Sequence, residues 1–395
     1  MPQIKSEVES FARIKVLGVG GSGKNVVNHM VASKVKGIDF IAINTDAQDL
    51  HNSLAKRKIH IGKNLTKGLG TGMNPEMGRK AVEETREEVQ EAIKGADMVF
   101  IACGLGGGTG SGASPLIAQV AKEAGCLTVA VVTKPFFFEG TQRNRIAESA
   151  LAELRKEVDA IIVIPNDRLL NNISKETTAK NAFAMCDNIL KQAVEGISDL
   201  ITTPGIINID FADIKAILKD TGSALMGIGI ANGDKRAEEA AKLAINSPLL
   251  DLSITGARGV LFSVAGGDDL TMFEIQDAAK TITESMDPDA RVIFGTIKDE
   301  SIKKGDVKVT IIASGFPENA EKKSLFANEQ HQAQQPKEEE KEKSGIMGGK
   351  IFNTIEKPKE IKKEIESPKN IKPESEDDDD DWGAVPAFLR RSKIK

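Results

Sequence analysis

The chain has 395 residues, of which 40% are hydrophobic and 28% are charged, with 36 Gly, one Trp, no Tyr and three Cys. Its formal net charge of −5 excludes a generally basic nucleic-acid-binding protein, and the lack of any run of about 18 apolar residues excludes direct membrane insertion. The three widely separated Cys and the four His show neither a disulfide pattern nor zinc-ligand spacing, which favours a reducing cytoplasm and no metal site built from these residues.

The first half of the chain alternates short apolar runs with helical patterns. After a flexible arm at residues 1–12, strands are predicted at 14–19, 40–43, 98–102, 127–132 and 160–164. Continuous β-branched runs of this kind are typical of strands buried on both faces of a parallel sheet. Residues 13–176 are therefore expected to form a Rossmann-type, doubly wound α/β domain.

The first strand runs into a glycine-rich turn. Gly18–Gly23 satisfies the pattern G-x-G-x-x-G, which lets backbone N–H groups approach a phosphate at a helix N-terminus. Alone, this pattern would also suit a nicotinamide-dependent dehydrogenase, with Asp46 after the second strand as the ribose ligand. Asn25 follows Lys24 where a P-loop requires Ser or Thr, so a P-loop is excluded.

A second glycine-rich turn is more specific. Gly104–Gly112 contains six Gly in nine residues, between a strand and a helix expected to begin near Ala113. A run of N–H donors there, with the hydroxyls of Thr109 and Ser111, would form a cradle for a di- or triphosphate, although a flexible surface loop is the alternative. A third turn, Lys67–Gly72, could close over the phosphates.

The second half begins with one long helix, predicted at 177–201 within a segment 177–203, followed by a smaller α+β domain at 204–318. Its strands are expected at 224–231, 259–265, 291–297 and 307–312, and its helices near 235–246 and 270–284. Asn208, Asp210 and Asp213 lie at the start of this domain, where two carboxylates could polarise a water and help to hold a cation. Alternatively, the two Asp cap a helix at 214–219, with Asp213 as a reasonable N-cap.

The C-terminal region divides into two segments. Residues 331–380 hold 10 Lys, 10 Glu and 4 Asp, and such a composition predicts a disordered linker, placed at 319–380. Residues 381–395 are net basic and contain the only Trp of the chain, beside Phe388 and Leu389. An apolar, basic terminus on a charged tether indicates a docking peptide, with a solvated tail as the alternative.

Several motifs together resemble those of one family. Gly106–Gly112 resembles the tubulin signature G-G-G-T-G-[ST]-G, and the chain around it is similar to the FtsZ family, the bacterial tubulin-like GTPases of cell division. The resemblance extends from residue 13 to about 316 and resumes at the C-terminal peptide. Its other motifs are Gly18–Gly23, Asn44–Asp46, Asn74–Glu76, Thr133–Phe136, Phe138–Gly140, Pro165–Asp167, Asn208–Asp213 and Pro386–Arg391.

The resemblance implies a tubulin-like fold and a GTP site. Asn166 and Asp187 would read the guanine and Phe183 would stack on it, although Phe183 could instead belong to the core. Glu139 and Arg143 would contact the ribose and phosphate side, or form an i, i+4 surface ion pair. The remaining nucleotide contacts would come from Gly21, Ser22, Gly23, Lys24, Asn25, Gly108, Thr109 and Gly110. Lys24 and Ser22 depart from many relatives, and Lys24 would either add charge to the phosphates or point to solvent; Phe137 makes its loop more aromatic than usual.

The resemblance also implies how the protein works. Asn208, Asp210 and Asp213 would act in trans on the pocket of the next subunit of a head-to-tail filament, so that hydrolysis of GTP to GDP, with Mg²⁺, requires assembly. The filaments would form the division ring at the inner face of the membrane. A membrane-tethering adaptor such as FtsA would bind Pro386, Phe388, Leu389, Arg390 and Arg391. A tubulin-like protein for plasmid or phage partition is the alternative, which the terminal peptide argues against.

Overall fold

The computed structural model describes residues 12–170, 177–203, 205–247, 254, 256–298 and 302–316. Residues 1–11 of the predicted arm, the charged linker and the docking peptide lie outside these residues, as does Pro204; the docking peptide includes Pro386, Phe388, Leu389, Arg390 and Arg391.

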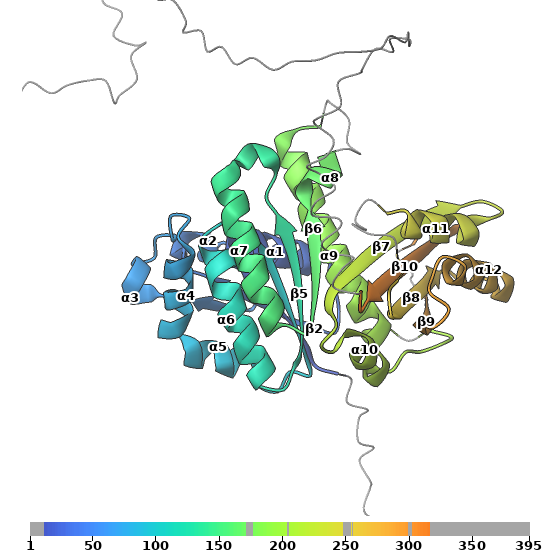
Figure 1. Cartoon of the computed structure of the whole chain (residues 1–395), viewed down its shortest axis with the longest axis horizontal. Coiled ribbons are helices and arrows are strands. Elements are labelled where there is room, and N and C mark those ends of the chain that lie inside the picture. The colour runs from blue at the N-terminus through green and yellow to red at the C-terminus, as the bar shows by residue number, and fades with distance from the viewer. Residues whose placement is uncertain are drawn as a thin grey trace, which may run out of the picture. The chain divides into compact units, whose positions relative to one another are not determined.

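The described strands form a single sheet of ten strands in the order β3-β2-β1-β4-β5-β6-β7-β10-β8-β9 (Figure 1). The first six strands are all parallel, and their order is that of a doubly wound nucleotide-binding domain. They are β1 (Ile14–Val19), β2 (Ile38–Asn44), β3 (Arg57–His60), β4 (Met98–Gly104), β5 (Leu127–Lys134) and β6 (Ala160–Pro165). The predicted α/β class is therefore confirmed.

The last four strands extend the same sheet with mixed directions. They are β7 (Gly222–Asn232), β8 (Gly259–Gly266), β9 (Arg291–Lys298) and β10 (Asp306–Ser314). β7 joins β6 in parallel through three residue pairs only, from Ala160–Gly222 to Ile162–Ala224. β10 then pairs antiparallel with β7 and β8, so the expected smaller α+β part continues the first sheet.

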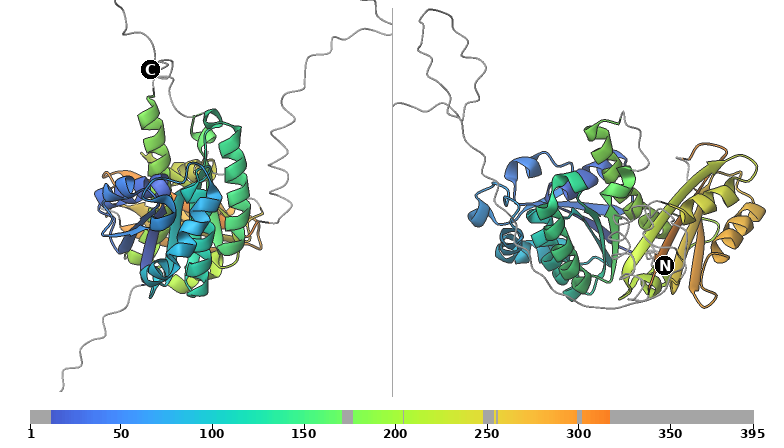
Figure 2. Two further views of the ribbon diagram at one scale, coloured as in Figure 1. Left: turned by 90° about the vertical axis from the view of Figure 1, so that its left-hand side faces the viewer. Right: turned by 45° about the horizontal axis from the view of Figure 1, so that its top comes forward.

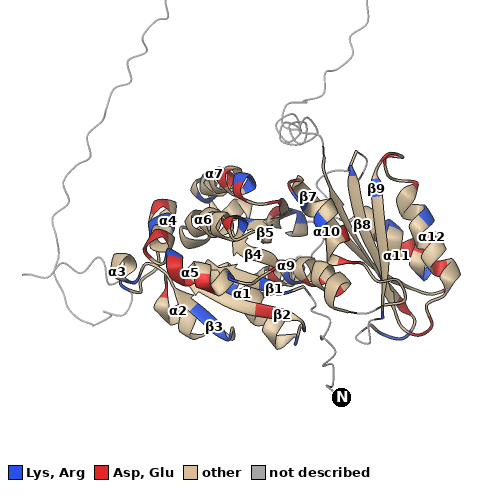
Figure 3. Ribbon diagram, turned by 90° about the horizontal axis from the view of Figure 1, so that it is seen from below, with Lys and Arg blue, Asp and Glu red and all other residues tan. Residues whose placement is uncertain are grey.

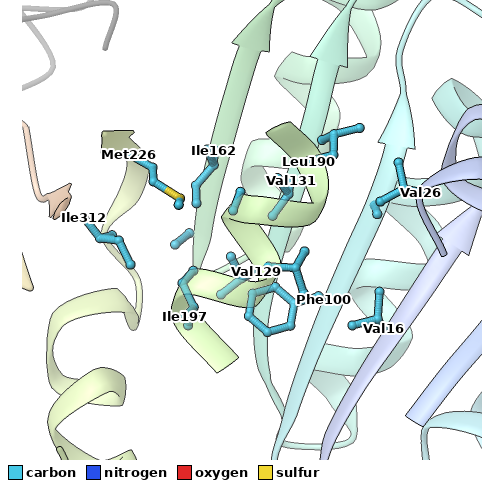
Figure 4. Packing of buried hydrophobic residues seen from close by; sticks show 14 of the residues in the cluster. Val16, Val26, Phe100, Val129, Val131, Ile162, Leu190, Ile197, Met226 and Ile312 are labelled. Carbon is cyan, nitrogen blue, oxygen red and sulfur yellow. The ribbon is translucent and has the colours of Figure 1, made fainter. Parts of the chain in front are cut away.

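Helices cover both faces of the parallel strands because alternate side chains of each strand point to opposite faces. Val16 and Phe100 pack with α1 (Gly20–Ala32) and with the long helix α9 (Ala179–Thr202), as Figure 4 shows. On the other face, Leu17 and Ile101 pack with four helices: α4 (Pro75–Glu84), α5 (Arg86–Ile93), α6 (Thr109–Glu123) and α7 (Thr141–Glu157). Charged residues lie mainly on the helices and loops, and β4, β6 and β8 carry none (Figure 3).

Helix α9 lies between the two parts of the sheet (Figure 2). Its buried residues Leu190 and Ile197 share a core with β5 and with α10 (Phe211–Leu218). The C-terminal strands have a separate core under α11 (Arg236–Ile245) and α12 (Met272–Thr283). The remaining elements are short: α2 (Ala47–His51), α3 (Lys63–Thr66), η1 (Phe137–Glu139) and α8 (Asn166–Leu170).

Two expected helix starts differ from the structure. The helix expected near Ala113 begins at Thr109, because the glycines after Gly108 already form its first turn. The expectation of Asp213 as N-cap is wrong: Asp210 caps α10, with its carboxylate accepting from the N–H of Ala212, and Asp213 lies in the first turn.

Candidate functional site

A cavity of about 370 Å³ opens at the carboxyl ends of β1, β4, β5 and β6. This is where ligands bind in open α/β sheets, since loops from several parallel strands converge at that edge. Of the predicted nucleotide-binding residues, all but Gly23 and Lys24 line it. They are Gly21, Ser22, Asn25, Gly108, Thr109, Gly110, Glu139, Arg143, Asn166, Phe183 and Asp187.

Two helix N-termini form one wall of the cavity. α1 begins at Gly20 and α6 at Thr109, and neither has an acidic residue in its first turn. A Cβ on Gly20 would lie 3.2 Å from the N atom of Gly110, so glycine allows the two turns to approach each other. The N–H groups of a first helical turn have no partner within the helix, and together with the helix dipoles they make this wall favourable for phosphate.

Gly23 has a packing role instead. A Cβ at this position would lie 2.2 Å from the carbonyl oxygen of Ala102. The glycine thus lets α1 rest directly on β1 and β4, and it holds the phosphate wall in place without lining it.

The third glycine-rich turn reaches the cavity through Thr71. The Thr71 hydroxyl lies 3.3 Å from the Thr109 hydroxyl, which lies 2.8 Å from the Thr45 hydroxyl. Three hydroxyls from three loops thus meet at the start of α6. Leu69 of the same turn is 73% exposed, so the turn contacts the cavity through one side only.

The end of the cavity opposite the two helix N-termini presents polar side chains that suit a polar ring. Asn166 is 5% exposed, and its Oδ1 atom has no hydrogen-bond partner among the described residues. Burial raises the pKa of Asp187 from 3.8 to about 6, and the Lys24 ammonium opposes this rise. A buried amide and a half-buried carboxylate, whose oxygens have no hydrogen-bond partner among the described residues, suit a ligand with both donor and acceptor atoms.

Phe183 lies beside this polar end. It is 46% exposed, and its ring meets Phe136 edge to face with centroids 5.3 Å apart. Its exposed side faces the cavity, so it is available for stacking and is not a core residue. Cys186 also lines the cavity and was not assigned from the sequence; burial raises its pKa to about 12, which keeps it a neutral thiol.

Glu139 and Arg143 form an ion pair and also line the cavity, so the two alternatives expected from their spacing both hold. They form an ion pair of 2.9 Å and both line the cavity. The other oxygen of Glu139 accepts from the N–H of Phe136 at 3.0 Å, which fixes the carboxylate. Arg143 remains 40% exposed, with donors free to meet an anion.

Lys24 neither lines the cavity nor points to solvent. Its side chain is buried, and its ammonium lies 2.6 Å from the Asp49 carboxylate. Asp46, which could have been the ribose ligand of a dehydrogenase, caps α2 by accepting from the N–H of Asp49. No sequence periodicity brings Lys24 and Asp49 together, so this pair could not be predicted.

Asn208, Asp210 and Asp213 lie away from this cavity. The first turns of α9 bring Phe183 and Asp187 to the cavity, and the acidic loop follows the other end of the helix. From Asp187 to the end of α9 at Thr202 the helix rises by about 22 Å, at about 1.5 Å per residue, so the two sites of one chain cannot share a ligand. All three side chains are exposed, and the oxygen of Asn208 accepts from the N–H of Gly205 at 2.7 Å.

The described residues contain no group of three or more His, Cys, Asp or Glu side chains that could hold a metal ion. A divalent cation in the cavity would therefore be held by oxygens of the bound molecule and by hydroxyls such as that of Thr109. Within the same residues, no helix is long and apolar enough to cross a membrane.

Comparisons with known proteins agree with this geometry. Residues 13–174 match the Tubulin/FtsZ family, GTPase domain, and residues 222–317 match the FtsZ family, C-terminal domain. An empty FtsZ dimer of M. jannaschii is 44% identical over 78% of this chain and 89% of its own, with a TM-score of 0.75. A GTPgS-bound protofilament of CetZ2 from Haloferax volcanii shares the fold, with a TM-score of 0.66 at 20% identity over 80% of this chain and 98% of its own.

Proposed function

Because this chain belongs to the tubulin/FtsZ family of GTPases, we propose that it polymerises head to tail into filaments of the division ring and hydrolyses GTP between adjacent subunits. The observation that carries this proposal is the separation of a nucleotide-type cavity and an exposed acidic loop at opposite ends of α9. In a head-to-tail filament these two ends meet, since a heterologous contact that does not close repeats along one axis.

The polar end of the cavity supports guanine as the base. Guanine offers its N1–H and N2 amino group as donors, and the Asp187 carboxylate is an acceptor without a protein hydrogen bond. Adenine presents an unprotonated N1 there and would leave that carboxylate unpaired. Leaving a half-buried charged acceptor unpaired beside a bound base costs more than a neutral hydrogen bond contributes.

The phosphate wall would hold the triphosphate through the N–H groups of α1 and α6, and Arg143 would add charge. Asp210 and Asp213 of the adjacent subunit, aided by Asn208, would orient a water in line with the γ-phosphate. The water oxygen bonds to the γ-phosphorus as the bond to the β–γ bridging oxygen breaks, and its proton passes towards the carboxylates. Positioning of this kind accounts for most catalysis of phosphoryl transfer.

The decisive variant is Asp213→Ala, with Asp234→Ala as a control that removes an equally exposed carboxylate elsewhere. We expect Asp213→Ala to bind GTP and to sediment with GTP and Mg²⁺ like the parent, while phosphate release falls at least tenfold. Parent activity per subunit should rise with protein concentration. Normal turnover by Asp213→Ala, or parent activity independent of concentration, would refute catalysis between subunits.

We further propose that Pro386, Phe388, Leu389, Arg390 and Arg391 dock a membrane-tethering adaptor of the FtsA type, which would hold the filaments at the inner face of the membrane. A chain that ends at residue 380 should then assemble and turn over GTP normally but lose adaptor binding. Unchanged adaptor binding by that chain would contradict the assignment.

A further inference from the structure

Lys24 is one of two buried basic side chains in the described part of the chain, and it does not line the cavity. The other, Arg236, lies 2.6 Å from both Asp269 and Glu274 and so joins α11 to the start of α12. Lys24 lies in α1, whose N-terminus forms part of the phosphate wall. A buried ion pair is weak evidence for stability, because desolvation offsets the attraction between the charges. The contacts of Lys24 therefore require another explanation, and they lead to that wall.

A continuous chain of polar contacts starts at the Lys24 ammonium. The ammonium lies 2.6 Å from one Asp49 oxygen, and the other Asp49 oxygen accepts from the side-chain amide of Asn44 at 2.8 Å. Because the Asn44 amino group faces this carboxylate, its Oδ1 atom accepts from the N–H of Thr45 at 2.8 Å and from that of Asp46 at 3.4 Å. The ion pair therefore fixes which way round the Asn44 amide lies, and with it the turn at the end of β2.

The turn at the end of β2 brings Thr45 to the start of α6. The hydroxyl oxygens of Thr45 and Thr109 lie 2.8 Å apart, and both residues are buried. Thr109 is the first residue of α6 and lines the cavity, whereas Thr45 does not. Thr71 approaches Thr109 less closely, with 3.3 Å between the hydroxyl oxygens. Since a hydroxyl has one proton, the short contact to Thr45 decides in which direction the Thr109 hydroxyl can donate.

We propose that Lys24 is a positioning residue for phosphate binding, which acts on Thr109 through this chain of contacts. In the positioned arrangement Thr45 donates its hydroxyl proton to the Thr109 oxygen, and Thr109 donates its own proton to a phosphate oxygen of the bound nucleotide. Lys24 itself touches neither the nucleotide nor the cavity. The inference rests on the proposed function in one respect, that the phosphates lie on the wall formed by α1 and α6.

The positioning role predicts a loss that is confined to phosphate binding. The base-binding end of the cavity is formed by α8 and α9, which this chain of contacts does not include. Lys24→Met should therefore weaken GDP binding about tenfold, the effect of one lost hydrogen bond to a charged group, and should leave the affinity for guanosine within about twofold. A general loosening of the site would instead lower both affinities together.

Two further variants separate positioning from the charge of Lys24 and from a direct effect on α1. Asp49→Ala leaves the lysine charge in place and removes the contact to Asn44. Positioning predicts weaker GDP binding by this variant, whereas attraction of phosphate by the lysine charge predicts tighter binding. Thr45→Val interrupts the chain of contacts beyond Asn44 and should weaken GDP binding as much as Lys24→Met does. Because both variants interrupt one chain of contacts, their double variant should bind GDP about as weakly as either single variant.

The experiment measures the affinities of the full-length chain for guanosine and GDP by calorimetric titration, with circular dichroism to follow folding. Lys36→Met, which removes an exposed lysine, is the matched control and should bind both ligands like the parent. Weaker GDP binding with parent guanosine binding in all three single variants, without further loss in the double variant, supports the proposal. Unchanged GDP binding, additive losses, tighter GDP binding by Asp49→Ala, or equal losses for guanosine and GDP overturn it. If Lys24→Met does not fold, Asp49→Ala, Thr45→Val and their double variant decide in the same way.

Thr109→Val separates this inference from the proposed function. If that variant binds GDP like the parent, the phosphates do not meet this wall and the proposed phosphate site fails. If it binds GDP more weakly while Lys24→Met and Thr45→Val keep the parent affinity, only the role of Lys24 fails.

Discussion

At the scale of single residues, the charged form of Asp187 destabilises the nucleotide-free protein, and a bound ligand would offset this loss of stability. Its pKa is raised by burial from 3.8 to about 6, so above pH 6 the folded chain must keep a partly desolvated charge that the unfolded chain exposes to water. Its contribution to stability is fully present below pH 3.8 and is lost as the pH rises through 6. Titratable side chains at functional sites commonly have pKa values shifted in this way.

Asp187→Asn should therefore stabilise the nucleotide-free protein and weaken GTP binding at the same time. At pH 7.5 we expect the free energy of unfolding to rise by about 1–2 kcal/mol, reduced from the full linkage value because the side chain is partly exposed. The gain should vanish near pH 4. Urea denaturation at both pH values checks this, with the exposed Asp234→Asn as control, and equal stability of variant and parent at pH 7.5 would contradict it.

The pKa of Asp187 also predicts a pH dependence of binding. Below pH 6 the protonated carboxyl can no longer accept both guanine donors, so GTP affinity should fall by up to about tenfold per pH unit. Calorimetric titration of GTP between pH 5 and pH 8 measures this. Constant affinity across that range would show that the carboxylate does not contact the base.

At the scale of secondary structure, α9 and every described strand except β3 could be predicted because their apolar patterns are local; β3, with the sequence Arg-Lys-Ile-His, has a single apolar residue and gives no such signal. The start of α6 could not, since its glycines resemble a loop until they are seen to form a helical turn against α4. Thr85 divides the helical pattern of residues 75–93 into α4 and α5, and its hydroxyl bonds to the carbonyl of Ala81. Where a helix begins or ends at such positions depends on tertiary packing, which overrides the local helix propensity.

In the candidate site, too, residues within one short motif could be assigned from the sequence, whereas contacts between residues far apart in the chain could not. Gly108, Thr109 and Gly110 could be assigned from one short motif. The role of Lys24 could not, because its partner Asp49 lies 25 residues away along the chain on another element. The spacing of Glu139 and Arg143 was visible in the sequence, but that the pair lines the cavity, and that the Oδ1 atom of Asn166 has no partner among the described residues, becomes visible only in the structure.

Gly107 and Gly112 offer a matched pair of substitutions within one turn. A Cβ on Gly112 would lie 1.9 Å from the Pro75 carbonyl oxygen, whereas one on Gly107 has no atom within 4 Å. Gly112→Ala should separate α4 from α6 and lower the free energy of unfolding by about 2 kcal/mol. Gly107→Ala should keep parent stability but weaken GTP binding, since it adds a methyl group to the cavity wall.

Thermal denaturation without nucleotide, followed by GTP titration, distinguishes the two variants. Equal loss of stability in both would mean that the turn is rigid throughout, and unchanged GTP affinity in Gly107→Ala would mean that the ligand does not approach this backbone.

At the scale of the whole described chain, the cavity and the acidic loop belong to different parts of one sheet. The parts are joined by the three residue pairs of β6 and β7 and by the length of α9. A shift of α9 at the cavity would therefore be transmitted along the helix to the acidic loop, and a shift at the loop to the cavity.

Catalysis between subunits predicts complementation. Asp213→Ala subunits keep a complete cavity and lack the loop carboxylate, whereas Asp187→Asn subunits keep the loop and have a weakened cavity. Random mixing of equal amounts should place an intact loop on an intact cavity at about a quarter of the contacts. Phosphate release by the mixture should exceed the mean of the two separate variants, and a rate equal to that mean would contradict shared sites.

The loop before α10 has one more consequence, for the outer edge of the sheet. β9 is an edge strand, and unpaired edges are templates for strands of other chains. The N–H of Thr296 donates to the Ile207 carbonyl at 3.0 Å, and a Cβ on Gly205 would collide with the Thr296 carbonyl. Residues 205–209 thus shield part of that edge, so the proposed filaments, in which copies of the chain would be concentrated, would be protected there against irregular β-aggregation.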